Sequence, residues 1–342
     1  MPHYTLALLG FGNVGKALAE LLLRKQDDVE QKTGITFSVV GIATGSRGFA
    51  IDSAGIDLKK ALDLKKSSQS LNAIHNSQLP IHNSMEFIQH CGADILIETT
   101  PVNYETGQPA VDYIRTALKL GMYVTTANKG PVVHAYRELT DLAESRGVKF
   151  YFESAVMDGA PVFGLFRETL PAARIQAFRG VLNSTTNLIL SRMENGESFE
   201  AAVKYAQSIG IAETDPSGDV DGWDAAIKVS ALATVYMGIP TKPNDVNRSG
   251  IRGITPEQIS QAKSEGKRWK LVCEARRVGD EFQASVAPQK VGIDSPLYGV
   301  EGTTSIVQIE SDILGKLSLI EEDPGPHTTA YGLLADFLNM VS

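Results

Sequence analysis

Cysteine is scarce in this sequence of 342 residues, and the two that occur, Cys91 and Cys273, lie far apart. Two such cysteines provide neither a disulfide framework nor a cysteine-based metal cluster. The six histidines are scattered without the spacing of metal ligands. The composition therefore favours a reducing compartment, and we expect a cytoplasmic protein.

Long apolar runs and an excess of basic charge are also missing. No apolar segment approaches the ~20 residues that span a bilayer, and the N-terminal residues enter an expected strand at once, which leaves no room for a signal peptide. The formal net charge of −8 argues against nucleic acid or an anionic membrane as a main partner. With 43% hydrophobic and 21% charged residues, the chain is typical of a globular protein with two domains.

The order of the expected elements predicts an α/β fold. Residues 1–152 alternate short apolar runs with helical patterns, which is typical of a doubly wound, Rossmann-type parallel sheet. Within them, residues 53–92 read as a polar surface insertion. Residues 153–322 are expected to form a second, mixed α/β domain, with helices at 188–193 and 199–208 and, after Trp269, antiparallel strands at 271–277, 282–286 and 305–311. A helix within residues 323–342 is expected to complete the first domain.

A glycine-rich turn follows the first expected strand. It reads Gly10-Phe11-Gly12-Asn13-Val14-Gly15 and leads directly into a helical pattern. Strand, G-x-G-x-x-G and helix in this order are the fingerprint of a dinucleotide-binding turn. The first glycine makes the turn, the second lets a pyrophosphate approach, and the third lets the helix pack on the strand.

The residues after the second expected strand bear on the choice of nucleotide. In many NAD sites this strand ends in a carboxylate that binds the ribose 2′-hydroxyl. Here Ser46 and Arg47 follow, and no carboxylate occurs before Asp52. Ser46 and Arg47 favour a 2′-phosphate and hence NADP, although Arg47 could equally be a solvated loop residue.

Polar residues also follow two later strands of the first domain. Thr99 and Thr100 come after the run ending at Glu98, and Lys129 comes after the run 122–126. Ligands bind at the carboxyl edge of a parallel sheet, so we expect all three residues near the cofactor. By position alone, Lys129 could as well be a solvated lysine.

Candidate catalytic residues concentrate in residues 210–233. Asp224 and Lys228 lie four residues apart on a helix of mostly small apolar residues, so they share one face. A lysine buried there needs a paired charge or a lowered pKa, and either suits proton transfer. The alternative is an ion pair on an exposed helix face.

Four carboxylates precede this helix, at Glu213, Asp215, Asp219 and Asp221. They could bind the ammonium group of a substrate, and Asp219 and Asp221 could instead cap the helix. A third alternative is that all four bind a divalent metal, which the lack of neighbouring histidines and of an EF-hand glycine disfavours.

Taken together, the motifs resemble homoserine dehydrogenase in its short form. The matching segments, which span nearly the whole chain, are 10–15, Ala127-Asn128-Lys129, Asn183-Ser184-Thr185-Thr186-Asn187 and 212–228. The resemblance implies reversible reduction of L-aspartate 4-semialdehyde to L-homoserine with NADPH or NADH, a catalytic and dimerisation domain at 153–322, and a homodimer. No segment is left for a fused aspartate kinase or a C-terminal regulatory domain, so feedback inhibition through such a domain is not expected.

The same resemblance implies roles for individual residues. Lys228 and Asp224 match the pair at the reacting oxygen, and Lys129 matches a second lysine that serves catalysis, substrate and cofactor. Glu213 and Asp219 match substrate-binding carboxylates, and amides near Thr185 could meet the substrate carboxylate. The family can hold a monovalent cation such as Na⁺ at the equivalents of four residues: Glu153 and the backbone of Val156, Asp158 and Ala160.

The chain departs from the family pattern at three places. Ser184 replaces the glycine of N-G-T-T-N, Ile211 replaces a frequent aromatic residue, and 323–330 replaces a glycine-rich turn near the cofactor. Two other functions stay open: another NADP-linked reductase of a small amino or oxo acid, and a non-catalytic nucleotide-sensing module. A sensor would not need Lys129, Asp224 and Lys228.

Overall fold

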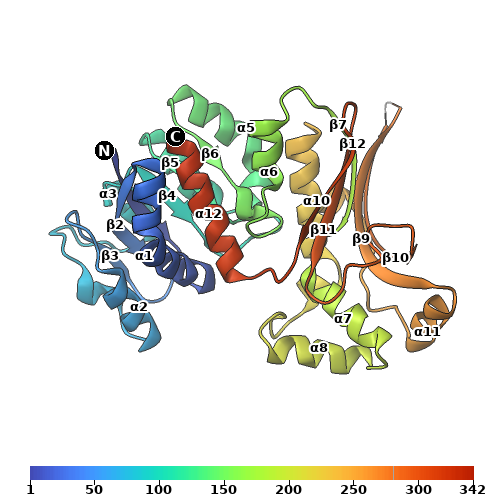
Figure 1. Cartoon of the computed structure of the whole chain (residues 1–342). Helices are drawn as coiled ribbons and strands as arrows, with labels where there is room; N and C mark the ends of the chain where they lie inside the picture. Colours follow the sequence, from blue (N-terminus) through green and yellow to red (C-terminus); the bar gives the residue numbers. More distant parts are fainter. Residues whose placement is uncertain (280) are drawn as a thin grey trace. The chain divides into compact units, whose positions relative to one another are not determined.

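The computed structural model describes residues 1–279 and 281–342, which separate into two units (Figure 1). Unit 1 comprises Met1–Pro161 and Gly325–Ser342, and unit 2 comprises Val162–Pro324. Within the described residues, no helix has both the length and the apolar character needed to cross a membrane.

Unit 1 contains a six-stranded sheet in the order β3-β2-β1-β4-β5-β6, parallel except for the antiparallel edge strand β3. The strand order reverses between β1 and β4, and doubly wound sheets bind ligands at the carboxyl ends of the strands at such a point. The predicted Rossmann-type sheet is therefore confirmed. The elements of unit 1 are β1 (His3–Leu9), α1 (Asn13–Thr33), β2 (Thr36–Ala43), β3 (Phe49–Ile51), α2 (Leu58–Lys66), η1 (Leu71–Ile74), α3 (Ser84–His90), β4 (Ile95–Glu98), α4 (Ala110–Lys119), β5 (Tyr123–Thr126), α5 (Lys129–Ser145), β6 (Phe150–Tyr151), η2 (Glu153–Ala155) and α12 (Pro326–Val341).

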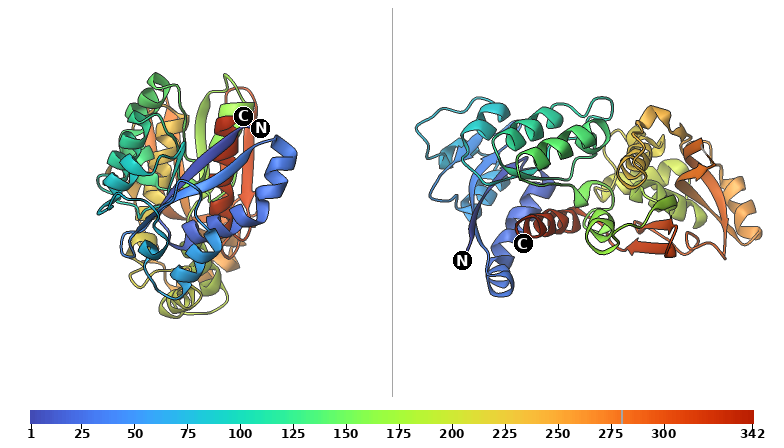
Figure 2. Two further views of the ribbon diagram at one scale, coloured as in Figure 1. Left: turned by 90° about the vertical axis from the view of Figure 1, so that its left-hand side faces the viewer. Right: turned by 90° about the horizontal axis from the view of Figure 1, so that it is seen from above.

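The C-terminal helix α12 completes the core of unit 1. It packs beside α1, and the two helices run side by side in the views of Figures 1 and 2. Phe337 is fully buried, and its ring meets those of Tyr4 and Phe37 edge to face at centroid distances of 6.2 and 5.8 Å. Helix α12 thus closes the hydrophobic core over β1 and β2.

Residues 53–92 are not merely the surface insertion that their polar composition suggested. Leu58, Ala61 and Leu71 belong to the main hydrophobic core, and Phe87 of α3 is fully buried. The segment also follows β3, an edge strand of only three residues. Isolated apolar residues in a polar sequence were too sparse to indicate this burial.

Unit 2 is built on a second six-stranded sheet, in the order β12-β11-β7-β9-β10-β8. Its strands pair antiparallel, except that β8 runs parallel to β10, and helices α7 and α10 contact β9. The mixed α/β character of this part is as predicted. The elements of unit 2 are α6 (Val162–Gly164), η3 (Leu165–Thr169), β7 (Ile175–Val181), α7 (Ser184–Glu194), α8 (Phe199–Ser208), α9 (Ser217–Val220), α10 (Trp223–Tyr236), η4 (Pro243–Asp245), β8 (Asn247–Arg248), α11 (Pro256–Ser264), β9 (Lys267–Val278), β10 (Glu281–Gly292), β11 (Ser305–Ser311) and β12 (Gly315–Glu321).

The turn Glu153–Pro161 is held against α12 within unit 1. The Ser154 hydroxyl donates to the Thr329 carbonyl (2.7 Å), and the Thr329 hydroxyl donates to the Asp158 carboxylate (2.6 Å). A Cβ atom at Gly332 would lie 2.3 Å from the Ser154 Oγ and 3.1 Å from the Asp158 carbonyl oxygen. The close approach of this turn therefore requires glycine in α12.

Replacing Gly332 by alanine tests this packing. We expect Gly332→Ala to lower the free energy of unfolding by about 1–3 kcal/mol, the usual cost of overpacking, because the Ser154 hydroxyl must leave its place. Gly299→Ala is the control, since a Cβ there meets nothing within 4 Å. Thermal melts of both variants provide the measurement, and equal melting temperatures would contradict the packing described.

Candidate functional site

The glycine-rich turn joins β1 to α1 at the carboxyl edge of the first sheet. Gly10 has φ +108°, and a Cβ there would lie 2.5 Å from the Thr99 Oγ1; a Cβ at Gly15 would lie 2.3 Å from the Gly10 carbonyl oxygen. A Cβ at Gly12, in contrast, meets nothing within 4 Å. The first and third glycines therefore close the turn on the protein, whereas the second leaves open space where a pyrophosphate can approach.

Three basic side chains gather beside this turn. Arg47 follows β2, with its backbone N–H donating to the Thr44 hydroxyl (2.7 Å), and its buried Nη1 has no hydrogen-bond partner among the described residues. Lys65 of α2 lies near two further positive charges, those of Arg47 and of Lys16 on α1. Burial lowers the pKa of Lys65, and the two neighbouring charges lower it further. This concentration of positive charge suits an anionic group. Ser46 is exposed in the same turn.

A buried carboxylate joins the ends of β4 and β5. Glu98 has no exposed surface, and it accepts from the Thr100 backbone N–H (2.6 Å), the Thr100 hydroxyl and the Thr126 hydroxyl (2.5 Å). Burial raises the pKa of Glu98, and the hydrogen bonds oppose that shift. Thr99 and Thr100 thus lie at the predicted sheet edge: Glu98 fixes Thr100, and the Thr99 hydroxyl donates to the Gly10 carbonyl (3.1 Å). Sequence reasoning identified both threonines but missed Glu98, which it took only as the end of a strand.

Lys129 begins helix α5 at the same edge. Asn128 caps this helix, with its side-chain oxygen accepting from the Gly130 N–H (2.9 Å), and its side-chain nitrogen donates to the carbonyl oxygens of Thr100 (3.2 Å) and Pro101 (3.4 Å). Lys129 is half-buried. The cap therefore fixes the start of α5 against the turn after β4.

In unit 2, one asparagine organises the acidic residues. Asn183 follows β7 and caps α7, its side-chain oxygen accepting from the Thr186 N–H (2.8 Å). Its side-chain nitrogen donates to Asp219 (2.7 Å) and to Asp224 (3.0 Å). Burial, and then the neighbouring charge of Asp224, raise the pKa of Asp219. Asn183 was part of the sequence motif but was not singled out.

The predicted pair of Asp224 and Lys228 forms and is largely buried. The Lys228 Nζ lies 3.1 Å from the Asp224 Oδ2, with side chains 15% and 13% exposed. The same ammonium donates to the Leu182 carbonyl oxygen at the end of β7 (2.7 Å). The alternative of an exposed surface pair is thus wrong, because α10 buries residues on nearly all sides.

The other acidic residues of this stretch point to separate partners. Asp215 accepts from the Ser217 N–H (3.0 Å), and Asp221 pairs with Arg252 (2.5 Å). Glu213 is exposed. Helix α10 begins after Gly222 without a side-chain cap, so the expectation that Asp219 and Asp221 cap it is wrong.

Each departure from the family pattern lies in a segment with defined local contacts. The Ser184 hydroxyl lies 3.3 Å from the Ser305 hydroxyl, and the Ile211 carbonyl accepts from the Thr185 hydroxyl (3.3 Å). Thr185 lies in the first turn of α7. At the C-terminal departure, Pro326 begins α12, and the Gly325 N–H donates to the Thr328 hydroxyl (2.9 Å).

Comparisons with known proteins cover both units. The family model for the NAD-binding domain of homoserine dehydrogenase matches residues 10–153, and the homoserine dehydrogenase model matches residues 161–338. An NAD(+)-dependent homoserine dehydrogenase of Pseudomonas canavaninivorans is 35% identical over 99% of this chain and 97% of its own length. A crystal structure of a putative homoserine dehydrogenase from Archaeoglobus fulgidus is 33% identical, with TM-score 0.86 and 98% of both chains covered. A hyperthermophilic archaeal homoserine dehydrogenase in complex with NADPH is 30% identical, with TM-score 0.83, over 99% of this chain and 98% of that one.

Proposed function

The chain belongs to the homoserine dehydrogenase family of NAD(P)-dependent oxidoreductases, and we propose that Lys228, Asp224 and Asp219 form its reacting centre. The reaction is the reversible reduction of L-aspartate 4-semialdehyde to L-homoserine, a step of threonine, methionine and isoleucine biosynthesis. The observation that carries the proposal is the buried Lys228 ammonium, held between Asp224 and the Leu182 carbonyl. Such a buried pair favours a catalytic role over a nucleotide-sensing module or a purely structural ion pair.

A nicotinamide held at the carboxyl edge of the first sheet would supply the hydride, and an alkoxide would then develop at the former aldehyde oxygen. Lys228 donates a proton to that oxygen in reduction and accepts it in oxidation. Asp224 keeps the ammonium in place, and Asn183 keeps Asp224 in place. Lys129 supplies a second positive charge for substrate and cofactor.

For the substrate ammonium group, Asp219 is the better of the two predicted carboxylates. It is held by Asn183 beside Asp224, and a cationic ligand would relieve the repulsion between the two carboxylates. Glu213 is exposed and could contribute only at the rim of such a site. Thr185, in the first turn of α7, is where backbone N–H groups can meet the substrate carboxylate.

Substitution of Lys228 tests the centre. We expect Lys228→Ala to lower kcat for homoserine oxidation at least ~100-fold, since general acid–base groups contribute about 10²–10⁴-fold. Lys204→Ala on α8 is the control and should keep wild-type turnover. Absorbance at 340 nm measures turnover and circular dichroism checks folding; near wild-type kcat in folded Lys228→Ala would remove the assignment.

The basic cluster of Lys16, Arg47 and Lys65 supports a proposal about the cofactor preference. We propose NADP as the preferred nucleotide, with NAD still accepted. The cluster and the unpartnered Arg47 Nη1 provide donors for a 2′-phosphate, and Ser46 lies in the same turn. The pyrophosphate would lie over the turn 10–15, near Thr99 and Thr100.

Removing Arg47 tests this preference. We expect Arg47→Ala to raise KM for NADP about 10-fold or more and to change KM for NAD less than about twofold, because a charge-assisted hydrogen bond contributes about 1.5–3 kcal/mol. Lys66→Ala, at an exposed neighbouring charge, is the control. Equal changes for both nucleotides would show that Arg47 does not recognise the 2′-phosphate.

A monovalent cation such as Na⁺ could bind in the turn 153–160 of unit 1. Hard cations take oxygen ligands, and the donor chemistry fits: the buried Glu153 carboxylate lies in the same turn as the backbone carbonyls of Val156, Asp158 and Ala160. The Asp158 carboxylate accepts from the Thr329 hydroxyl (2.6 Å), which ties this turn to α12. Such an ion would brace the turn on which α12 packs.

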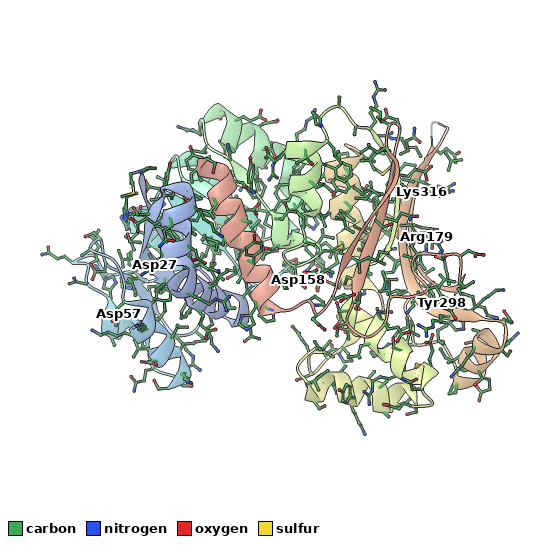
Figure 3. The ribbon with its side chains drawn as sticks, viewed as in Figure 1. Asp27, Asp57, Asp158, Arg179, Tyr298 and Lys316 are labelled. Atoms are coloured by element: carbon green, nitrogen blue, oxygen red, sulfur yellow. The ribbon has the colours of Figure 1, made fainter. Side chains whose placement is uncertain are left out.

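We also propose a homodimer formed through the polar face of the second sheet. Oppositely charged residues share this face, and such a mixture suits a two-fold contact; Figure 3 labels Arg179 on β7 and Lys316 on β12. The hairpin of β11 and β12 adds the exposed Ile313, Leu314 and Ile320.

Both cysteines are free and buried, which supports a reducing, cytoplasmic location.

Charge reversal on this face tests the dimer. Size exclusion with light scattering should give twice the chain mass for the wild type. For Arg179→Glu/Lys316→Glu it should give the mass of one chain, because repulsion replaces attraction across the contact. Lys59→Glu/Lys60→Glu on α2 is the matched control. A monomeric wild type, or a dimeric double variant, would contradict this interface.

A further inference from the structure

Strand β9 carries a fully buried lysine that the mechanism above does not use. Lys270 has no exposed surface, and its ammonium donates to the Asn187 side-chain oxygen (3.0 Å) and to the Val300 carbonyl oxygen. A buried ammonium is costly unless its hydrogen bonds are made. Packing alone does not explain a lysine at position 270, because an apolar residue of similar volume would avoid the desolvation cost of the ammonium.

Asn187 connects this lysine to helix α7. Its side-chain nitrogen lies within hydrogen-bond distance of three carbonyl oxygens, those of Val300 (3.4 Å), Gly302 (3.1 Å) and Thr304 (3.2 Å). Its side-chain oxygen accepts from Lys270. The amide is therefore fixed in one orientation, since a flip would turn its nitrogen toward the ammonium.

The segment 300–305 makes two further hydrogen-bond contacts with α7. We call this segment, together with Lys270, the α7 clasp. The Ser184 hydroxyl meets that of Ser305, and the Gly302 N–H donates to the Ser191 hydroxyl (3.2 Å). Asn187 lies one helical turn after Asn183, with its N–H donating to the Asn183 carbonyl (3.2 Å). The clasp thus fixes the turn of α7 that begins with the asparagine holding Asp219 and Asp224.

We propose that Lys270 is a positioning residue for the dehydrogenase reaction, acting through Asn187 and the start of α7 on the Asn183 contacts to Asp219 and Asp224. The proposal rests on the proposed roles of those two carboxylates and of Lys228. Lys270 itself touches neither of these acidic residues in the contacts described. It acts by holding the backbone from which their partner extends.

The charged groups around Lys270 come from three directions. Glu194 lies at the end of α7, Arg268 on β9 itself, and Glu301 in the clasp. Burial lowers the pKa of Lys270 to about 8, because it outweighs the attraction of the two carboxylates. Glu194 and Glu301 are in turn paired with Arg268.

Steady-state kinetics of Lys270→Met test the proposal. In homoserine oxidation at pH 7 and 25 °C, we expect kcat/KM for homoserine to fall about 10- to 100-fold, the loss that a misplacement of about 1 Å can cause. KM for the nucleotide should change less than about twofold, because the glycine-rich turn belongs to unit 1. Lys267→Met, an exposed lysine three residues earlier on β9, is the matched control and should match the wild type.

A double-mutant cycle identifies the route of the effect. Asn187→Ala should lower kcat/KM by a similar factor, and Lys270→Met/Asn187→Ala should show about the same loss and not the product of the two. Multiplicative losses would contradict action through Asn187. Folded Lys270→Met with wild-type kcat/KM would overturn the proposal, whereas active Lys228→Ala would instead overturn the reacting centre on which it rests.

A second variant covers failure of Lys270→Met to fold. Lys270→Gln can still donate but is one bond shorter, so we expect an intermediate loss of about 3- to 10-fold. Wild-type turnover in this variant would also overturn the proposal.

Stability provides a check on the buried ammonium. Between pH 8 and 10.5 the unfolded chain holds one more proton than the folded chain, so the stability of the wild type should rise with pH across that window, relative to either variant.

Discussion

The carboxamide of Asn183 is the contact on which the catalytic half of this protein depends. One side-chain nitrogen serves two carboxylates, Asp219 and Asp224, that would otherwise repel each other in a buried setting. Asp224 in turn holds the Lys228 ammonium, which also donates to the carbonyl of Leu182, between β7 and Asn183. Strand β7, α7 and α10 are therefore tied together by polar contacts, and removing one partner leaves a buried charge uncompensated at a cost of about 3–5 kcal/mol.

The nucleotide-binding half also contains a buried carboxylate, but here the hydrogen-bond donors described are uncharged. Glu98 is fully buried, and its partners are two hydroxyls and a backbone N–H rather than a cation. This arrangement fixes the ends of β4 and β5 with no positive charge among the hydrogen-bond partners described for the buried carboxylate, which are hydroxyl and N–H groups. Positive charge instead gathers at Lys16, Arg47 and Lys65, where an anionic group of the nucleotide would benefit from it.

Local patterns predicted the parts of the structure that local physics decides. The glycine-rich turn, the strand 305–311 and the helix 199–208 follow from spacing and short-range periodicity, and the structure has the last two at the same bounds. The start of α7 was missed because its polar residues resemble a loop, and its helical state depends on the Asn183 cap and the clasp. Strands β8 and β12 and the full lengths of β9 and β10 depend on pairing partners distant in the sequence.

Burial of single polar residues was the least predictable property of the site. Glu98 and Lys270 look like ordinary strand-end and strand charges, and only the packed structure removes them from water. Glu213 shows the reverse, because its place in a specific motif does not prevent it from being exposed. Asp224 and Lys228 were recognisable because a dense run of small apolar residues surrounds them in the sequence itself.

The return of α12 to unit 1 has a consequence for biosynthesis on the ribosome. The ring of Phe337 completes a core begun by Tyr4 and Phe37, yet all of unit 2 is translated between them. At typical elongation rates of about 5–20 residues per second, the apolar surface of α1 and β2 stays uncovered for many seconds until α12 is synthesised. During that interval the nascent N-terminal half keeps this apolar surface exposed, whereas every strand of unit 2 is translated before α12.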